Sequence, residues 1–380
     1  MLGPWTRDVR RARAAAAVLA LVAAGCSTTE GPQGTPGPSA TRSPTGSASA
    51  TTPASPAPAP RPRPVRIAFA GDIHFEGVLA DRLRDPATAL APASAALAAA
   101  DVAIANLETS VGSGGTPEPG KRFTFSAGPA AFAALSAAGI DVASMANNHA
   151  LDFGRARLPS TLRAARAAAS AEPPLAVVGI GRDRDEAFRP ALTDVDGTLV
   201  ATVAATVADR DPSADRTGQW AATSDRGGTA DALDPAYLLA AVRRADRTAD
   251  VVVAYLHWGV QGERCPSPDQ RTLARRLVDA GADVVVGTHA HELQGDGRLG
   301  RGYVAYGLGN FAWYSPGRSG VLTLTVRPSR EPTGRATVVR SSWWPAAIGA
   351  DGLATRLRGS AATAFAADRA SLRACARLTR

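Results

Sequence analysis

Short apolar runs rich in β-branched residues recur from residue 65 onward, and they constrain the fold more than any other feature. They occupy residues 65–70, 102–105, 142–145, 176–180, 199–207, 251–256, 284–286, 303–306, 321–326 and 337–340. Stretches rich in Ala, Leu and Arg lie between many of them, at 86–100, 128–138, 155–170, 234–247 and 268–281. Apolar strands that alternate with helices indicate sheets covered on both faces. The pattern predicts an α/β domain over residues 65–380 with two sheets in the middle. The strands between 303 and 344 lack long intervening helices, so we expect them to be antiparallel.

The N-terminal residues have a different character and predict an export signal. Four arginines, at positions 7, 10, 11 and 13, precede an apolar run over 14–24. That run is shorter than the roughly 20 residues that span a bilayer, and the combination is typical of a secretory signal. The run ends in AAGC (23–26), which resembles the lipobox of bacterial lipoproteins, where the cysteine, here Cys26, receives the lipid. The alternative is an ordinary cleaved signal with an incidental cysteine.

Residues 27–64 consist mainly of Pro, Ser, Thr, Ala and Gly. A segment with so little to bury cannot offset the entropy of ordering, so we expect a disordered, semi-rigid tether. This tether favours the lipoprotein interpretation. The expected organisation is a signal with lipobox (1–26), a tether (27–64) and one folded domain (65–380), anchored by lipid on the extracytoplasmic face of the cell membrane.

The charge distribution argues against a nucleic-acid partner. Of the net charge of +8, residues 1–64 supply +5, from seven arginines against Asp8 and Glu30. The remaining +3 is spread over the folded part, without a basic stripe interleaved with aromatic residues. In an exported protein the two other cysteines, Cys265 and Cys375, are expected to pair, because neither has a metal-binding spacing.

All histidines of the chain lie just after expected strands, beside Asp, Asn or Gly. There are only five: His74, His149, His257, His289 and His291. In open α/β sheets, ligand groups gather beyond the carboxyl ends of the strands. Scattered structural histidines would not be expected to share this position, so we interpret the five as parts of one site.

Two short spacings strengthen this interpretation. Asp72 lies two residues before His74, and in an extended segment both side chains point to the same face. The same spacing separates His289 from His291, so both imidazoles are expected to point one way.

Oxygen donors at other strand ends complete the set, with Glu108 after the second run and Asn148 before His149. Imidazole together with carboxylate suits first-row divalent metals such as Zn, Mn or Fe. Six or seven ligands are too many for one tetrahedral centre. They fit two ions roughly 3.5–4 Å apart, which lower the pKa of a shared water and clamp the oxygens of a phosphoryl group.

Six motifs in order carry a resemblance to a known family. They are GDIHFEG (71–77), ANLET (105–109), NNHALDFG (147–154), HWGVQGE (257–263), VVGTHAHELQG (285–295) and YGLGNF (306–311). The set resembles the CapA family of poly-γ-glutamate (capsule) synthesis proteins, which looks like a branch of the calcineurin-like metallophosphoesterases. The resemblance covers about residues 65–345. It implies a four-layer α/β/β/α sandwich with mixed sheets and a site for two divalent metal ions.

The resemblance also implies a role for each residue. The ligands of the first ion would be Asp72, His74 and His291, and those of the second ion Asn148, His257 and His289. Glu108 would bridge the two ions. His149 would act as the acid that protonates the leaving oxygen, with Asp152 orienting it.

We therefore expect a metallophosphoesterase-like hydrolase that acts in the synthesis or export of poly-γ-glutamate or a capsule. Its expected partners are an anionic polymer or a phosphoester, the membrane, and other capsule-synthesis membrane proteins. Glu108 departs from the family pattern, because metallophosphoesterases carry Asp at the bridge. This departure keeps open an alternative, a non-catalytic, metal-containing assembly or polymer-binding factor of the cell envelope. Hydrolysis of the polymer's amide bonds would use the same water and is a third interpretation.

Overall fold

The computed structural model describes residues 62–207, 220–329 and 334–380. The expected signal, the lipidation site Cys26 and the tether up to residue 61 lie outside the described residues and stay predictions. Within the described part, no helix is both long enough and apolar enough to cross a bilayer.

The first of two large sheets combines parallel and antiparallel strands. Its order is β18–β17–β16–β1–β2–β5–β6, and β15 also pairs with β1. These strands are β1 (Val65–Ile73), β2 (Val102–Leu107), β5 (Val142–Ser144), β6 (Ala176–Val178), β15 (Asn310–Ala312), β16 (Gly317–Arg327), β17 (Thr337–Ile348) and β18 (Ala354–Arg356). Strands β1, β2, β5 and β6 are parallel to one another, whereas β16, β17 and β18 pair in an antiparallel manner. The antiparallel expectation is therefore confirmed for β16 and β17.

The second sheet has the order β13–β14–β12–β11–β9–β8. Its strands are β8 (Ala191–Val195), β9 (Thr198–Thr206), β11 (Val251–Trp258), β12 (Val284–His289), β13 (Asp296–Leu299) and β14 (Gly302–Ala305). The central strands are parallel, and β8 and β13 form antiparallel edges. The antiparallel expectation is wrong for β14, which runs parallel to β12 because β13 reverses the chain before it. Two small sheets pair β3 (Ser110–Val111) with β4 (Ser126–Ala127) and β7 (Ile180–Gly181) with β10 (Gly228–Thr229).

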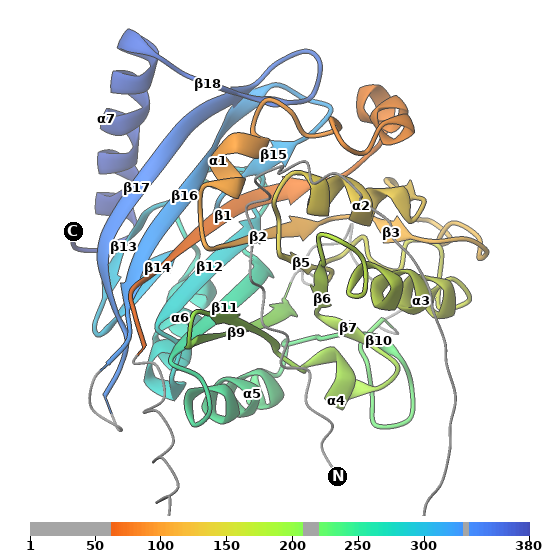
Figure 1. Cartoon of the computed structure of the whole chain (residues 1–380), viewed down its shortest axis with the longest axis horizontal. Helices are drawn as coiled ribbons and strands as arrows, with labels where there is room; N and C mark the ends of the chain where they lie inside the picture. Colours follow the sequence, from red (N-terminus) through yellow and green to blue (C-terminus); the bar gives the residue numbers. More distant parts are fainter. Residues whose placement is uncertain (1–61, 208–219, 330–333) are drawn as a thin grey trace, which may run out of the picture. The chain divides into compact units, whose positions relative to one another are not determined.

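Helices cover the outer face of each large sheet (Figure 1). They are α1 (Ser94–Ala98), α2 (Ala130–Ala137), α3 (Leu158–Ala168), α4 (Arg184–Ala187), α5 (Ala236–Asp246), α6 (Pro268–Ala280) and α7 (Gly359–Cys375), with a 3-10 helix η1 (Gly77–Arg84). Helices α1 and α3 pack on the first sheet, and α5 and α6 pack on the second. The single helix expected over 86–100 is wrong. Pro86 and Pro92 interrupt it, and only the short α1 forms.

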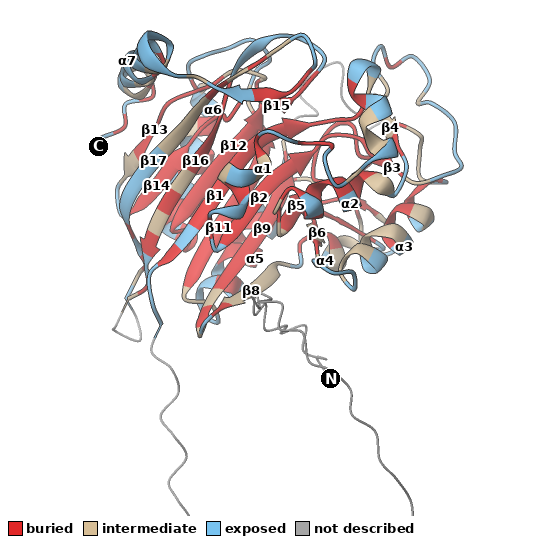
Figure 2. Cartoon of the chain, turned by 45° about the horizontal axis from the view of Figure 1, so that its top comes forward, coloured by how far each residue is buried: buried red, intermediate tan, exposed pale blue. Residues whose placement is uncertain are grey.

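The two sheets share one buried layer between them. In β1, Ile67 and Phe69 join the core that contains the second sheet, whereas Ala68 and Ala70 pack with the residues of α1 and α2. This period-two alternation explains why residues 67–70 of β1 are apolar without interruption. The buried Tyr255 hydroxyl of β11 donates a hydrogen bond to the carbonyl oxygen of Ala70, 2.6 Å away. Strands β2, β11 and β12 are buried throughout (Figure 2), and the architecture is the α/β/β/α sandwich that the sequence implied.

Helix α7 packs against β13 and β17. Its last residue, Cys375, forms a disulfide with Cys265 in the loop after β11, with the two Cα atoms 5.8 Å apart. Arg369 of α7 also holds the buried carboxylate of Asp296 at the start of β13. The C-terminal helix is thus tied to the segment that follows His257.

Candidate metal centre

Donor side chains converge where the carboxyl ends of the parallel strands meet. β1 carries Asp72 near its end, and Glu108 follows β2 directly. From the second sheet, β11 contributes His257 and β12 ends at His289. Parallel strands end at the same edge, so residues far apart in sequence meet there.

The first group of donors is buried and includes Glu108, His257 and His289, whose ligand atoms all lie within 4.8 Å of one another. His257 Nε2 is 3.1 Å from His289 Nδ1, 3.5 Å from Glu108 Oε1 and 2.6 Å from Asn148 Oδ1. Ligands bound at the usual 2.0–2.2 Å to one tetrahedral ion are separated by about 3.3–3.6 Å. The His257–Glu108 and His257–His289 separations lie at or near this range, whereas Asn148 Oδ1 is close enough to His257 Nε2 for a hydrogen bond that an ion would replace. We call these four residues the inner cluster.

The second group contains Asp72, Glu108 and His291, again with ligand atoms within 4.8 Å of one another. We call these three residues the outer cluster. His291 Nδ1 is 3.4 Å from Asp72 Oδ2 and 2.7 Å from Asn310 Oδ1. The side chain of His291 is 20% exposed, whereas that of Asp72 is fully buried. Glu108 belongs to both clusters, which is the arrangement that a bridging ligand requires.

His289 and His291 lie in different clusters because the chain turns between them. Both have positive φ, 86° and 56°, so the extended conformation expected for this pair is wrong. Such a conformation costs on the order of 1–3 kcal/mol for a non-glycine residue and persists only when its surroundings impose it. Here the His289 backbone N–H donates to Asp72 Oδ2 at 3.1 Å. The turn directs one imidazole to each group.

His74 lies beside the centre but is in neither cluster. Its Nδ1 accepts a hydrogen bond from the backbone N–H of Glu76 at 2.9 Å. Its other ring nitrogen, Nε2, is buried and has no hydrogen-bond partner among the described residues. The ring is packed among Phe125, Trp313 and Tyr314, with centroid distances of 4.8, 4.1 and 4.8 Å. Burial, with added repulsion from two other histidines, lowers the pKa of His74 to about 3.

His149 and Asp152, which the resemblance implies as an acid and its orienting carboxylate, contact each other. His149 Nδ1 is 2.6 Å from Asp152 Oδ2, and its Nε2 faces Glu108 Oε1 at 3.8 Å. Phe125 stacks on the His149 ring with centroids 4.0 Å apart, and its backbone N–H donates to Asp152. The imidazole is therefore fixed with one nitrogen toward the shared ligand of the two clusters.

Three side chains that the sequence analysis did not select orient the ligands. Thr288 Oγ1 is 2.9 Å from His257 Nδ1, which leaves Nε2 of that ring directed into the inner cluster. Asn106 donates from Nδ2 to Asp72 Oδ1 at 2.8 Å, and Asn147 donates to Asn106 Oδ1 at 3.0 Å. Asn106 stands two residues before Glu108, so the period-two rule would have found it.

Asn310 is a fourth such residue, in a segment that the motifs include. Gly71 allows β1 to approach this segment, since a Cβ on Gly71 would lie 1.8 Å from the carbonyl oxygen of Gly309. The Asp72 N–H donates to that same oxygen at 3.0 Å. The close approach places Asn310 against His291 of the outer cluster.

The buried carboxylates of the two clusters create a site that favours the binding of a cation. Burial, and then the charge of Asp72, raise the pKa of Glu108 well above its usual value. Glu108 Oε1 has no hydrogen-bond partner among the described residues. Burial opposes protonation of His291, but Glu108 and Asp72 outweigh it and raise the pKa of His291 to about 9. Buried carboxylates are costly unless they are paired or coordinate a metal, so the residues present fit divalent cations.

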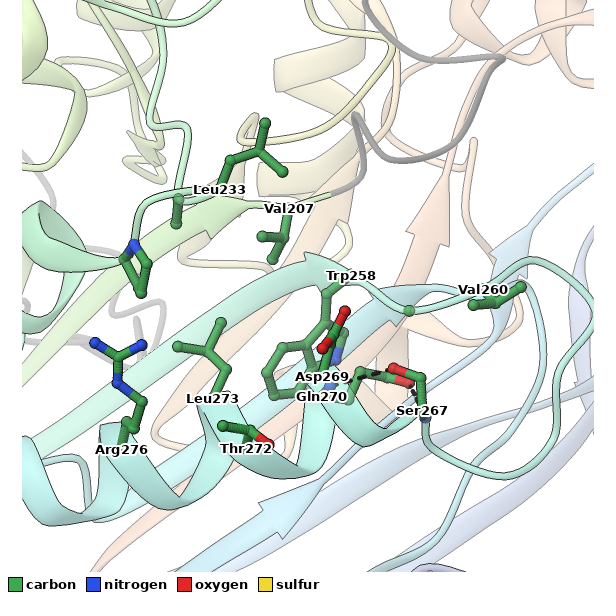
Figure 3. A pocket seen from close by; sticks show the side chains of 13 residues that line it. Val207, Leu233, Trp258, Val260, Ser267, Asp269, Gln270, Thr272, Leu273 and Arg276 are labelled. Carbon is green, nitrogen blue, oxygen red and sulfur yellow. Dashed lines mark hydrogen bonds between the residues drawn. The ribbon is translucent and has the colours of Figure 1, made fainter.

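A pocket of about 230 Å³ lies elsewhere, between the ends of β9 and β11 and helix α6 (Figure 3). Trp258 lines it, next to His257 in sequence but on the opposite face of the strand. The Trp258 indole donates to the carbonyl oxygen of Tyr306 at 2.8 Å and is almost fully buried. Trp258 thus forms a wall of this pocket, and none of the residues of the two clusters lines it.

Comparison with known proteins identifies one family. Residues 66–315 match the model of a family described as the bacterial capsule synthesis protein PGA_cap. The capsule biosynthesis protein CapA of Bacillus anthracis is 34% identical over 184 residues, which are 47% of this chain and 42% of that protein. The PGA biosynthesis protein CapA of Bacillus subtilis (strain 168) is 33% identical, over 45% of this chain and 42% of that protein.

A probable polyglutamine synthesis accessory protein of Mycobacterium tuberculosis is also 33% identical, over 51% of this chain and 50% of that protein. The matched region thus spans about half the length, or less, of these curated relatives. Among solved structures, a novel phosphatase from Mycoplasma pneumoniae aligns with a TM-score of 0.45 at 12% identity, over 76% of this chain and 95% of that one. A hypothetical protein from Thermus thermophilus aligns with a TM-score of 0.42 at 17% identity, over 74% of this chain and 99% of that one.

Proposed function

Because the chain belongs to the PGA_cap family of bacterial capsule synthesis proteins, we propose that it acts in the synthesis or export of a poly-γ-glutamate-type capsule polymer, through a metal-dependent hydrolase site. The observation that carries the hydrolase assignment is the pair of donor clusters that share Glu108. A shared carboxylate between two sets of imidazole and carboxylate donors is the arrangement of two-metal hydrolases.

In this proposal the inner and outer clusters each hold one divalent ion of the Mn, Zn or Fe type. When bound, the ions neutralise the charge of a phosphoryl group and lower the pKa of a water at the site. His149 transfers a proton to the departing oxygen from Nε2, while Asp152 keeps the ring in place through Nδ1. His291 is the one partly exposed ligand, so we place the substrate on its side.

The location in the proposal follows from the N-terminal sequence. The basic residues, the short apolar run and Cys26 support export and lipid anchoring, and residues 27–64 support a spacer between membrane and domain. A protein held there can meet an anionic polymer and capsule-synthesis proteins of the membrane. Incorporation of labelled fatty acid into the wild type but not into Cys26→Ala would support the anchor, and equal labelling would refute it.

A second candidate is an assembly or polymer-binding factor that retains the ions without turnover. One observation favours it: Glu108 occupies the bridge position, where metallophosphoesterases carry Asp. Full metal occupancy without hydrolysis of phosphodiesters or of polyglutamate would select this candidate over the hydrolase.

The first test is elemental analysis of the purified full-length chain after dialysis with Mn²⁺ or Zn²⁺. The proposal predicts about two ions per chain. Fewer than about one ion, with either metal, would refute a two-metal site.

The second test addresses the acid. We expect His149→Ala to lower kcat by about 10²–10⁴-fold on a phosphodiester with an alkyl leaving group, because that oxygen must be protonated as it departs. A nitrophenyl leaving group needs little protonation and serves as the matched control, with a much smaller loss expected. Equal losses on the two substrates would show that His149 is not the acid.

A further inference from the structure

Lys121 is the single lysine among the 42 basic residues of the chain. Its side chain is fully buried, and so is the side chain of Asp152, with which it forms an ion pair. Lysine is almost never fully buried without a specific partner, because removing an ammonium from water is costly. Every other member of this set is arginine, so a buried lysine at this position indicates that the site needs an ammonium group and not a guanidinium.

The contacts of Lys121 identify that requirement. Its Nζ donates to Asp152 Oδ1 and to the backbone carbonyl oxygen of Asn148. The Trp220 ring lies on the ammonium, 4.4 Å from centroid to Nζ. An ammonium is compact and directs three donors, whereas a guanidinium is a planar fork. The space between two oxygens and an indole therefore suits lysine.

The two acceptors are the ends of one short segment, and each end faces the centre. Asn148 Oδ1 lies 2.6 Å from His257 Nε2 of the inner cluster. The second oxygen of Asp152 lies 2.6 Å from His149 Nδ1. The loop of Lys121 also holds this segment through its backbone, since the Glu118 N–H donates to the Asp152 carbonyl oxygen at 2.7 Å.

We infer that Lys121 is a positioning residue of the metal centre. Its ammonium fixes the backbone at Asn148 and the carboxylate of Asp152, so that the Asn148 amide faces the inner cluster and His149 faces Glu108. The inference rests on the proposed function, because it assumes that the inner cluster holds an ion. It adds a residue that touches neither ion nor substrate and still sets the affinity of one ion.

The direct test replaces Lys121 with methionine in the full-length chain. We expect calorimetric titration with Mn²⁺ to show one of two binding steps weakened by about 10–100-fold, as for other groups that orient a metal ligand, with the other step retained. A crystal structure of the metal-free variant should show Asn148 Oδ1 displaced from His257 Nε2. Unchanged affinities, or an unchanged separation of these two atoms, would overturn the inference.

Lys121→Met leaves the Asp152 carboxylate buried without its cation, and this can prevent folding. A second pair of variants avoids this problem. Asp152→Asn retains the contact of Lys121 with the Asn148 carbonyl, and the double variant Lys121→Met/Asp152→Asn removes both charges. We expect the inner-step affinity to be about 10–100-fold lower in the double variant than in Asp152→Asn. Equal affinities would refute the positioning role.

The same titrations show whether the proposed metal site fails or only the positioning role of Lys121 fails. A wild-type chain that binds no ion would overturn the proposed function and the positioning role together. A wild-type chain that binds two ions, with variants that bind them equally well, would overturn only the role of Lys121.

Discussion

The inner and outer clusters share Glu108 but differ in how exposed their other ligands are. In the inner cluster, His257 is oriented by Thr288, and Asn148 is held through its carbonyl by Lys121. All of its side chains are buried. In the outer cluster, His291 is partly exposed and contacts Asn310.

This difference suggests a division of labour. A closed, fully oriented set of ligands is typical of an ion held permanently, whereas an open position is typical of an ion that meets substrate. We therefore expect the inner ion to bind more tightly and to stabilise the fold, and the outer ion to exchange and to support turnover. Substitutions at each cluster test this contrast.

The largest effect is expected at the shared ligand. Glu108→Ala removes one donor from each cluster, so both affinities should fall by at least about 100-fold, more than for an orienting residue. Elemental analysis after dialysis should then give close to no bound metal. Glu108→Asp is the matched control, because it keeps the carboxylate, and it should retain at least one ion. Two tightly bound ions in Glu108→Ala would contradict the shared-ligand arrangement.

A smaller effect is expected when one cluster alone is changed. His257→Ala should remove the inner ion and His291→Ala the outer ion. An ion present at 100 times its Kd stabilises a protein by about 2.7 kcal/mol. Thermal unfolding with and without Mn²⁺ should therefore show a larger loss of metal-dependent stabilisation in His257→Ala. If His291→Ala loses as much stabilisation, the two clusters are equivalent and the proposed division fails.

The smallest effect is expected for His74, which lies outside both clusters. His74→Gln should keep two bound ions, because the Nδ1 of this ring is engaged by the Glu76 backbone. Titration with Mn²⁺ checks this directly. Loss of one ion would show that His74 rotates to become a ligand when metal binds, as the sequence resemblance implied.

Much of the fold was predictable because buried parallel strands appear in the sequence as short runs of apolar residues. The runs that became β1, β2, β11 and β12 are apolar because helices or the opposite sheet cover both of their faces. The failures have local causes. The stretch over 86–100 has a helical composition, but its prolines break the helix, and strand direction, as in β14, is not encoded in periodicity.

The sequence was sufficient to predict where the site lies in the fold, but not how its side chains are arranged. The strand-end rule brought Asp72, Glu108 and His257 to one place. It could not show that the backbone turns at His289, because a left-handed residue leaves no mark in a period-two pattern. The sequence did not place Lys121 at the site either, since it comes from a loop and acts on a segment 27 residues further along the chain.

The most direct test of the account is anomalous diffraction from crystals of the full-length chain grown with Mn²⁺. We expect two anomalous peaks about 3.5–4 Å apart, the spacing of two-metal sites, with Glu108 in contact with both. A single peak, or two peaks of which one lies away from Glu108, would contradict it.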